Sequence, residues 1–165
     1  MKFLDINTGR IAKYKIFHII LLVAMSLTVL SFFIHSMMPQ AVSREEIDGA
    51  AGVVDSVIPE STEAGSFIIS NLSSIAHLFE YGVLGTECAL YVWLFIGKRR
   101  MAAIASVALA HAIAFIDETI QIFSGRAADI VDIWLDITGY TAMFAVVSAI
   151  AFTVVKFKGK GRKNG

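Results

Sequence analysis

Ionisable side chains gather in one short stretch of this 165-residue chain, between positions 117 and 136. Five carboxylates and one arginine lie there between two long apolar runs: Asp117, Glu118, Arg126, Asp129, Asp132 and Asp136. We interpret the stretch as the end of one membrane helix, a tight turn and the start of the next. Ionisable groups at such a position are energetically costly, so they predict a functional site.

The composition is that of an integral membrane protein. Hydrophobic residues make up 56% of the chain and charged residues only 17%, whereas a soluble domain carries roughly 25% charged residues. The mean hydropathy is +0.70. The formal net charge of zero gives no indication of nucleic-acid binding. Cys88 is the single cysteine, which excludes an intrachain disulfide.

Four apolar runs are each long enough to cross a bilayer, which takes about 20 residues in a helix. They lie at Ile16–Met38, within Phe67–Gly97, from Met101 to about Phe123, and from near Asp129 to Val155. We therefore predict an all-α, four-helix membrane bundle over residues 16–155, between an N-terminal segment, 1–15, and a basic tail, 156–165. A cleaved signal peptide is the rival interpretation of the first run, which is longer than the 7–15-residue core of such a peptide.

The link between the first two runs, residues 39–66, is polar and predicted to form an outer loop. Ser43 followed three residues later by Glu46 matches a capping box, which predicts a helix starting there. Apolar residues then repeat at helical spacing at Ile47, Ala50, Val54, Val57 and Ile58. A short amphipathic helix lying on the membrane is one interpretation, and a solvated loop is the other.

The distribution of bases predicts the orientation in the membrane. Four of the 14 bases lie in the N-terminal segment, three at 98–100 and five in the tail, while Arg44 and Arg126 are alone in the two opposite loops. Because lysine and arginine collect on the cytoplasmic side, both termini are predicted to be cytoplasmic. The expected location is the bacterial cytoplasmic membrane.

A helical rise of 1.5 Å per residue converts sequence position into depth. Counting about 20 residues from each group of cytoplasmic bases brings three helices to one outer layer, where the polar residues are His77, Glu80, Asp117, Glu118, Gln121, Asp132 and Asp136. Helical periodicity places the members from each helix on one face. We expect them to line a polar cleft that opens outwards.

Several chemistries suit this set of side chains. Two carboxylates at one depth, Glu80 and Glu118, cannot both ionise cheaply in a partly apolar site. With His77 they are the candidate acid, base or metal-ligating residues. Mg²⁺ or Ca²⁺ would suit the oxygen-rich set, and Zn²⁺ would suit one that includes the histidine. No spacing is a specific metal motif, so the sequence assigns no cofactor.

A second polar pair is predicted near the middle of the membrane. Glu87 and His111 both lie twelve residues from Arg99, at the turn between the second and third helices. We predict that they touch or share a water, either as structural glue between helices or as a proton relay. Gly82, Gly85 and Gly139 are predicted to allow close approach of helices.

The chain resembles the VanZ-like family at the residues of the outer layer. The matching positions are His77, Glu80, Tyr81, Asp117, Glu118, Gln121, Arg126, Asp132 and Gly139. Asp136 stands where that family usually has asparagine. The resemblance implies a small multi-pass bacterial membrane protein, and the name-giving member is associated with resistance to teicoplanin.

Three functions remain open from the sequence. The first is a VanZ-like envelope protein that binds a membrane lipid or a lipid-linked envelope precursor in the outer cleft, with glycopeptide resistance as one role. The second is an intramembrane enzyme acting on a lipid. The third is a proton-coupled transporter. The expected ligand-binding residues are His77, Glu80, Tyr81, Asp117, Glu118, Gln121, Arg126, Asp132 and Asp136.

Overall fold

A computed structural model describes residues 6–126 and 129–161, with side chains described as far as Phe157 in the last helix. All regular elements in these ranges are helices: α1 (Thr8–Lys13), α2 (Lys15–Ser36), α3 (Gln40–Val57), α4 (Glu63–Ser70), α5 (Leu72–Phe95), α6 (Arg99–Phe123) and α7 (Ile130–Gly161). The all-α prediction is confirmed. Parts of the predicted N-terminal segment and basic tail, residues 1–5 and 162–165, lie outside the described residues.

Three of these helices, α2, α6 and α7, are each long and apolar enough to cross a membrane. The second predicted span is broken: α4 and α5 pass the same test together, with a bend of 69° between them. The spans also expose many large apolar side chains, such as Ile16, Leu109 and Phe152. Because such side chains are stable when they face lipid, this exposure fits a membrane-embedded protein with three or four spans.

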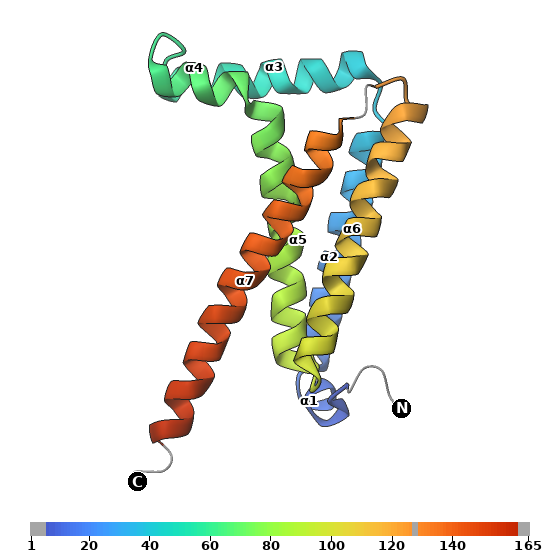
Figure 1. The fold of residues 1–165 in the computed structure, drawn as a ribbon, viewed down its shortest axis with the longest axis vertical. Coiled ribbons are helices and arrows are strands. Elements are labelled where there is room, and N and C mark those ends of the chain that lie inside the picture. Colours follow the sequence, from blue (N-terminus) through green and yellow to red (C-terminus); the bar gives the residue numbers. More distant parts are fainter. Residues whose placement is uncertain (1–5, 127–128, 162–165) are drawn as a thin grey trace.

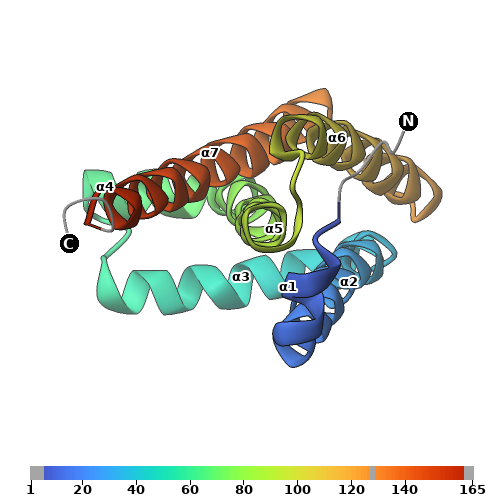
Figure 2. The same ribbon diagram turned by 90° about the horizontal axis from the view of Figure 1, so that it is seen from below.

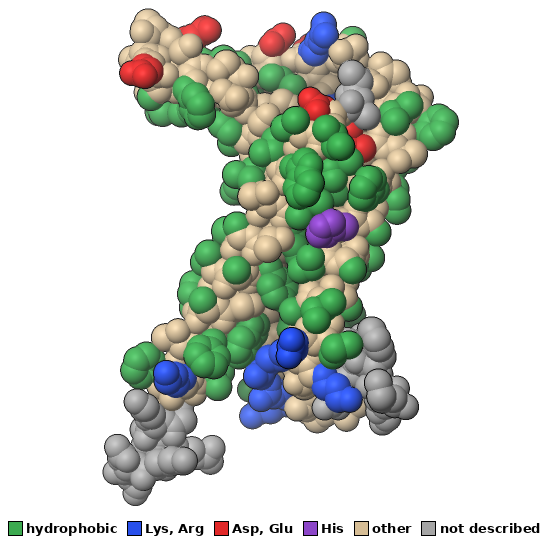
Figure 3. Space-filling view, in the orientation of Figure 1, with side chains coloured by type: hydrophobic (Ala, Val, Ile, Leu, Met, Phe, Trp, Pro, Cys, Tyr) green, Lys and Arg blue, Asp and Glu red, His purple; other side chains and the backbone are tan. Residues whose placement is uncertain are grey.

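The helices divide the molecule into two ends of opposite character (Figure 1). α1, the turn between α5 and α6 and the last turns of α7 lie at one end, and α3 and α4 lie across the other. Lysine and arginine side chains gather at the first end and carboxylates at the second, with an apolar zone between them (Figure 3). The charge asymmetry expected from the sequence is therefore an asymmetry of the folded molecule.

Two glycines hold α5 and α7 in the most extensive helix contact of the described residues. A Cβ atom on Gly85 would lie 2.3 Å from the carbonyl oxygen of Tyr140, and one on Gly139 would lie 2.2 Å from that of Leu78. Small residues allow this backbone-to-backbone packing in membrane helices. The predicted role of these two glycines in close helix contact is confirmed.

α5 lies at the centre of the molecule, with α7 on one side and α2 on the other (Figure 2). Phe32 of α2 stacks on Tyr81 of α5, with ring centroids 4.7 Å apart. The same core contains Ala89 of α5, Ala114 of α6 and Tyr140 of α7. These buried contacts pack all four long helices around one core.

The link between α2 and α5, predicted as an outer loop with a short amphipathic helix as one interpretation, is largely helical. α3 begins at Gln40 after Pro39 and ends at Val57, so the predicted start at Ser43 is wrong. Proline fixes φ near −65° and is well suited to the start of a helix, and Ser43 is instead a buried residue inside α3. Its neighbour one turn on, Ile47, is also partly covered, which is the amphipathic pattern that the spacing predicted.

Candidate functional site

The centre of the predicted outer polar layer is a hydrogen-bonded pair between α5 and α7. His77 Nδ1 lies 3.0 Å from Asp136 Oδ1, and Asp136 is fully buried. The pair follows from the helix crossing, because Gly139 contacts Leu78, the residue after His77, and Asp136 lies one turn before Gly139. On the other side of the imidazole, Nε2 lies 4.0 Å from a carboxylate oxygen of Asp132.

α6 contributes a second, linked network. The side-chain amide of Gln121 donates to Asp117 Oδ2 at 3.3 Å and to Glu118 Oε1 at 3.1 Å. All three residues are buried. Ser36, the last residue of α2, forms a short hydrogen bond with the other oxygen of Asp117. Four helices therefore contribute polar groups to one buried layer.

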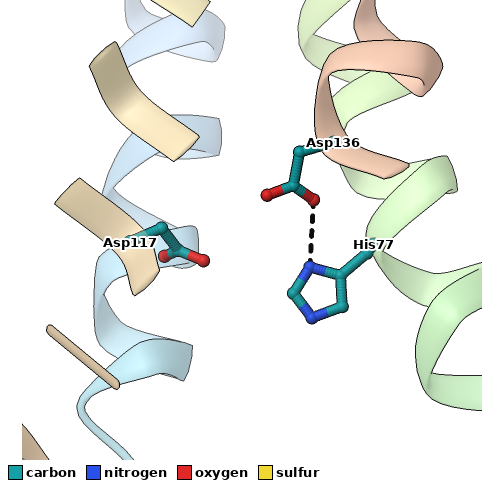
Figure 4. A group of neighbouring side chains, drawn as sticks. All are labelled: His77, Asp117 and Asp136. Carbon is teal, nitrogen blue, oxygen red and sulfur yellow. Dashed lines mark hydrogen bonds and ion pairs between the residues drawn. The ribbon is translucent and has the colours of Figure 1, made fainter. Parts of the chain in front are cut away.

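His77, Asp117 and Asp136 converge on one point, although they come from three helices (Figure 4). Each offers one ligand atom, and these atoms all lie within 4.8 Å of one another. Asp136 Oδ2 is buried and has no hydrogen-bond partner. The same is true of the hydroxyl of Tyr81, which lies one turn after His77 on α5. The arrangement is that of a small polar site closed off by apolar helices.

The end of α6 positions the arginine of the following turn. Gly125 has φ of +76°, the amide of Arg126 donates to Gln121 O at 3.0 Å, and the amide of Gly125 donates to Ile122 O at 3.2 Å. These two bonds form a Schellman motif, which favours glycine at the left-handed position. The guanidinium of Arg126 then donates to the carbonyl of His35 at 3.4 Å, so the turn is fixed against the end of α2.

The start of α7 closes the same layer from the other side of the turn. Asp129 accepts a hydrogen bond from the amide of Val131, as a helix N-cap does, and its own amide donates to Glu118 Oε2 at 3.1 Å. Asp129 is therefore the N-cap of α7. The carboxylate of Glu118 therefore accepts hydrogen bonds from Gln121 on α6 and from Asp129 at the start of α7.

Glu80 belongs to a separate, more exposed group. Its carboxylate lies 3.7 Å from His35 Nδ1, and the other ring nitrogen of His35 lies 3.4 Å from a carboxylate oxygen of Glu46 on α3. Glu80 and Glu118, the two candidate acids that the depth count paired, thus lie in different networks. α2 supplies the partner of Glu80, because α5 faces α2 as well as α7.

The nine predicted ligand-binding residues fall into three sets by burial. Tyr81, Asp117, Glu118, Gln121 and Asp136 are buried, His77 is largely covered, and Glu80, Arg126 and Asp132 are partly exposed around them. The polar layer is accordingly a buried centre with a partly exposed rim.

The prediction that Glu87 and His111 touch directly is wrong. Glu87 accepts a hydrogen bond from Thr28 of α2 at 3.2 Å, while His111 Nδ1 lies 2.8 Å from the carbonyl of Val107 in its own helix. Equal distance from the turn at 98–100 gives equal depth, but α5 and α6 diverge from that turn and make few contacts (Figure 1). Depth matching alone therefore does not identify a contact.

Two residues of the site, His35 and Ser36, were missed by the sequence analysis. The depth count was applied from the cytoplasmic bases to the second, third and fourth spans only. The same count of about 20 residues from Lys15 along the first span would have reached His35 and Ser36. The signal was present in the sequence, in the one helix that the family pattern did not include.

The profile of the VanZ/LLP1 family matches residues 15–152. The chain belongs to this family. The VanZ/LLP1 match includes all of α2, α5 and α6 and most of α7, and so contains every residue of the polar layer. No curated protein and no solved structure matches the chain.

Proposed function

We propose that this VanZ/LLP1 protein crosses the bacterial cytoplasmic membrane four times, with both termini cytoplasmic. The fourth span in this proposal is the bent pair α4 and α5. The orientation is supported by the collection of lysine and arginine at the end that carries α1 and the last turns of α7. The polar layer of His77, Asp117 and Asp136 then faces the outer leaflet.

We propose further that this layer binds the head group of a membrane lipid or of a lipid-linked envelope precursor. One observation carries the proposal: an apolar groove of about 410 Å³ lies between α5 and α7 directly beside the polar centre. Leu78 and Gly139 line this groove. Leu78 is the residue after His77 on α5, and Gly139 lies one turn after Asp136 on α7. A hydrocarbon chain in the groove would bring its head group to the polar centre.

The rim of the site suits an anionic or hydroxylated head group. Arg126 presents a guanidinium that can bind a phosphate or carboxylate through two nitrogens. The carboxylates of Glu80 and Asp132 lie on the same rim and can accept hydrogen bonds from hydroxyl or amide groups. Glycopeptide resistance would follow from this activity if the bound lipid is a cell-wall precursor.

An intramembrane enzyme is the second candidate, and the His77–Asp136 hydrogen bond favours it. A histidine oriented by a carboxylate is a common arrangement for general acid–base chemistry. A proton-coupled transporter loses the contact on which its relay depended, because Glu87 bonds to Thr28 and not to His111.

The binding proposal is tested with the chain purified in a mild detergent, by native mass spectrometry with two lipid probes. An isoprenoid phosphate and phosphatidylglycerol share an anionic phosphate but differ in the hydrocarbon chain, so their comparison separates a precursor from an ordinary membrane lipid. We expect Arg126→Ala to reduce retention of the favoured probe at least tenfold. Arg44→Ala, the other outer base and an exposed residue of α3, should leave retention unchanged.

The groove is tested separately by filling it. Val83 lines the groove on α5, so Val83→Phe should reduce retention of both probes. Ile104→Phe places the same side chain on an exposed apolar position of α6 and is the matched control. Equal retention by all four variants and the unaltered chain would show that neither the rim nor the groove binds lipid.

A further inference from the structure

We propose that His77, Asp117 and Asp136 bind a divalent cation of the Zn²⁺ class at the outer ends of α5, α6 and α7. Their ligand atoms lie within 4.8 Å of one another, a spacing from which small side-chain rotations can reach a common ion. The three residues come from three helices, so the ion would tie the outer end of the molecule together.

The independent support comes from an unsatisfied atom. Asp136 is 0% exposed, and its Oδ2 has no hydrogen-bond partner. Figure 4 shows this second oxygen directed away from His77, on the side of Asp117. A buried carboxylate oxygen without a partner costs free energy, and a cation held between Asp136 and Asp117 would satisfy it.

The local charge also favours a cation. Two buried carboxylates beside one imidazole cannot both ionise cheaply in a low-dielectric site unless a cation lies between them. Arg126, the base in the turn between α6 and α7, donates to the carbonyl of His35 rather than to either carboxylate. Ser36 Oγ lies within hydrogen-bonding distance of both Phe32 O and Asp117, but one hydroxyl has only one hydrogen to donate. A hydroxyl is also neutral, so it carries no positive charge to offset the carboxylate of Asp117.

The chemistry of the ligands selects the ion. One imidazole nitrogen with two carboxylate oxygens suits Zn²⁺, whereas Mg²⁺ and Ca²⁺ prefer oxygen alone. Three protein ligands leave a fourth tetrahedral position open. That position could hold a phosphate or carboxylate oxygen of the head group. This use of the ion rests on the proposed lipid-binding function, whereas binding of the ion itself is independent of it.

The test is calorimetric titration of Zn²⁺ into tag-free protein that has been stripped with a chelator and purified in detergent. We expect one tight site per chain and a Zn²⁺-dependent rise in the thermal midpoint. Asp117→Asn and Asp136→Asn should each weaken Zn²⁺ binding at least tenfold. The asparagine at 136 keeps a carbonyl oxygen that can accept from His77, so this variant should still fold. Asp48→Asn, on the exposed face of α3, is the control and should bind Zn²⁺ normally.

Two results would overturn the proposal. One is the absence of a tight Zn²⁺ site, or equal binding by the Asp117→Asn and Asp48→Asn variants. The other is a pair of asparagine variants that are more stable than the unaltered chain and indifferent to Zn²⁺, which would identify a site that holds a proton. Retention of the lipid probes with chelator present separates the two proposals, because lipid binding without Zn²⁺ binding refutes only the cation site.

Discussion

The crossing of α5 and α7 gives the sharpest quantitative prediction, through the substitution Gly139→Ala. The added Cβ would lie 2.2 Å from the carbonyl oxygen of Leu78. Ordinary van der Waals contact begins at about 3.4 Å, so the two helices would have to separate by about 1 Å at this point. The obstacle is backbone rather than a flexible side chain, and it cannot rotate away.

The expected magnitude combines two effects of opposite sign. Overpacking a close contact costs about 1–3 kcal/mol, while replacing glycine by alanine within a helix gains about 0.8–1.0 kcal/mol of helix propensity. Gly49→Ala provides the second effect alone, because a Cβ on Gly49 of α3 would meet nothing within 4 Å. We therefore expect Gly139→Ala to be less stable than Gly49→Ala by about 1–3 kcal/mol.

The assay is reversible unfolding of both variants in mixed detergent micelles, followed by circular dichroism. Gly85→Ala is a second test of the same contact, because its Cβ would lie 2.3 Å from Tyr140 O, and it should fall in the same range. Equal stability of the Gly139→Ala and Gly49→Ala variants would refute the backbone contact. It would also remove the reason for placing His77 beside Asp136.

Two further predictions concern the hydrogen-bond partner of Glu87 and the orientation of the chain in the membrane. In double-mutant cycles, Thr28→Val and Glu87→Gln should couple by about 0.6 kcal/mol, the average for hydrogen bonds between membrane helices, whereas Glu87→Gln and His111→Gln should be additive. Coupling of the second pair and not the first would reverse the assignment. In intact cells an impermeant thiol reagent should label Glu63→Cys and spare Lys156→Cys, and the opposite pattern would invert the proposed topology.

The sequence by itself determined the class of the protein and the layer in which its polar residues meet. Apolar runs of the right length predict the four segments that carry α2, α5, α6 and α7, and the depth count groups His77 with Asp117 and Asp136. These inferences succeed because helix rise and bilayer thickness are fixed lengths. Residue spacing is therefore enough to predict which residues lie at one level of the helix bundle.

Only the tertiary structure decided which residues of that layer touch. Depth does not fix the direction in which a helix leans or the neighbour that it faces, and both depend on packing. Gly85 and Gly139 bring α5 against α7, which pairs His77 with Asp136, while the divergence of α5 from α6 separates Glu87 from His111. Side-chain contacts between helices are set by these crossings, and a crossing is a property of two surfaces that lie far apart in the sequence.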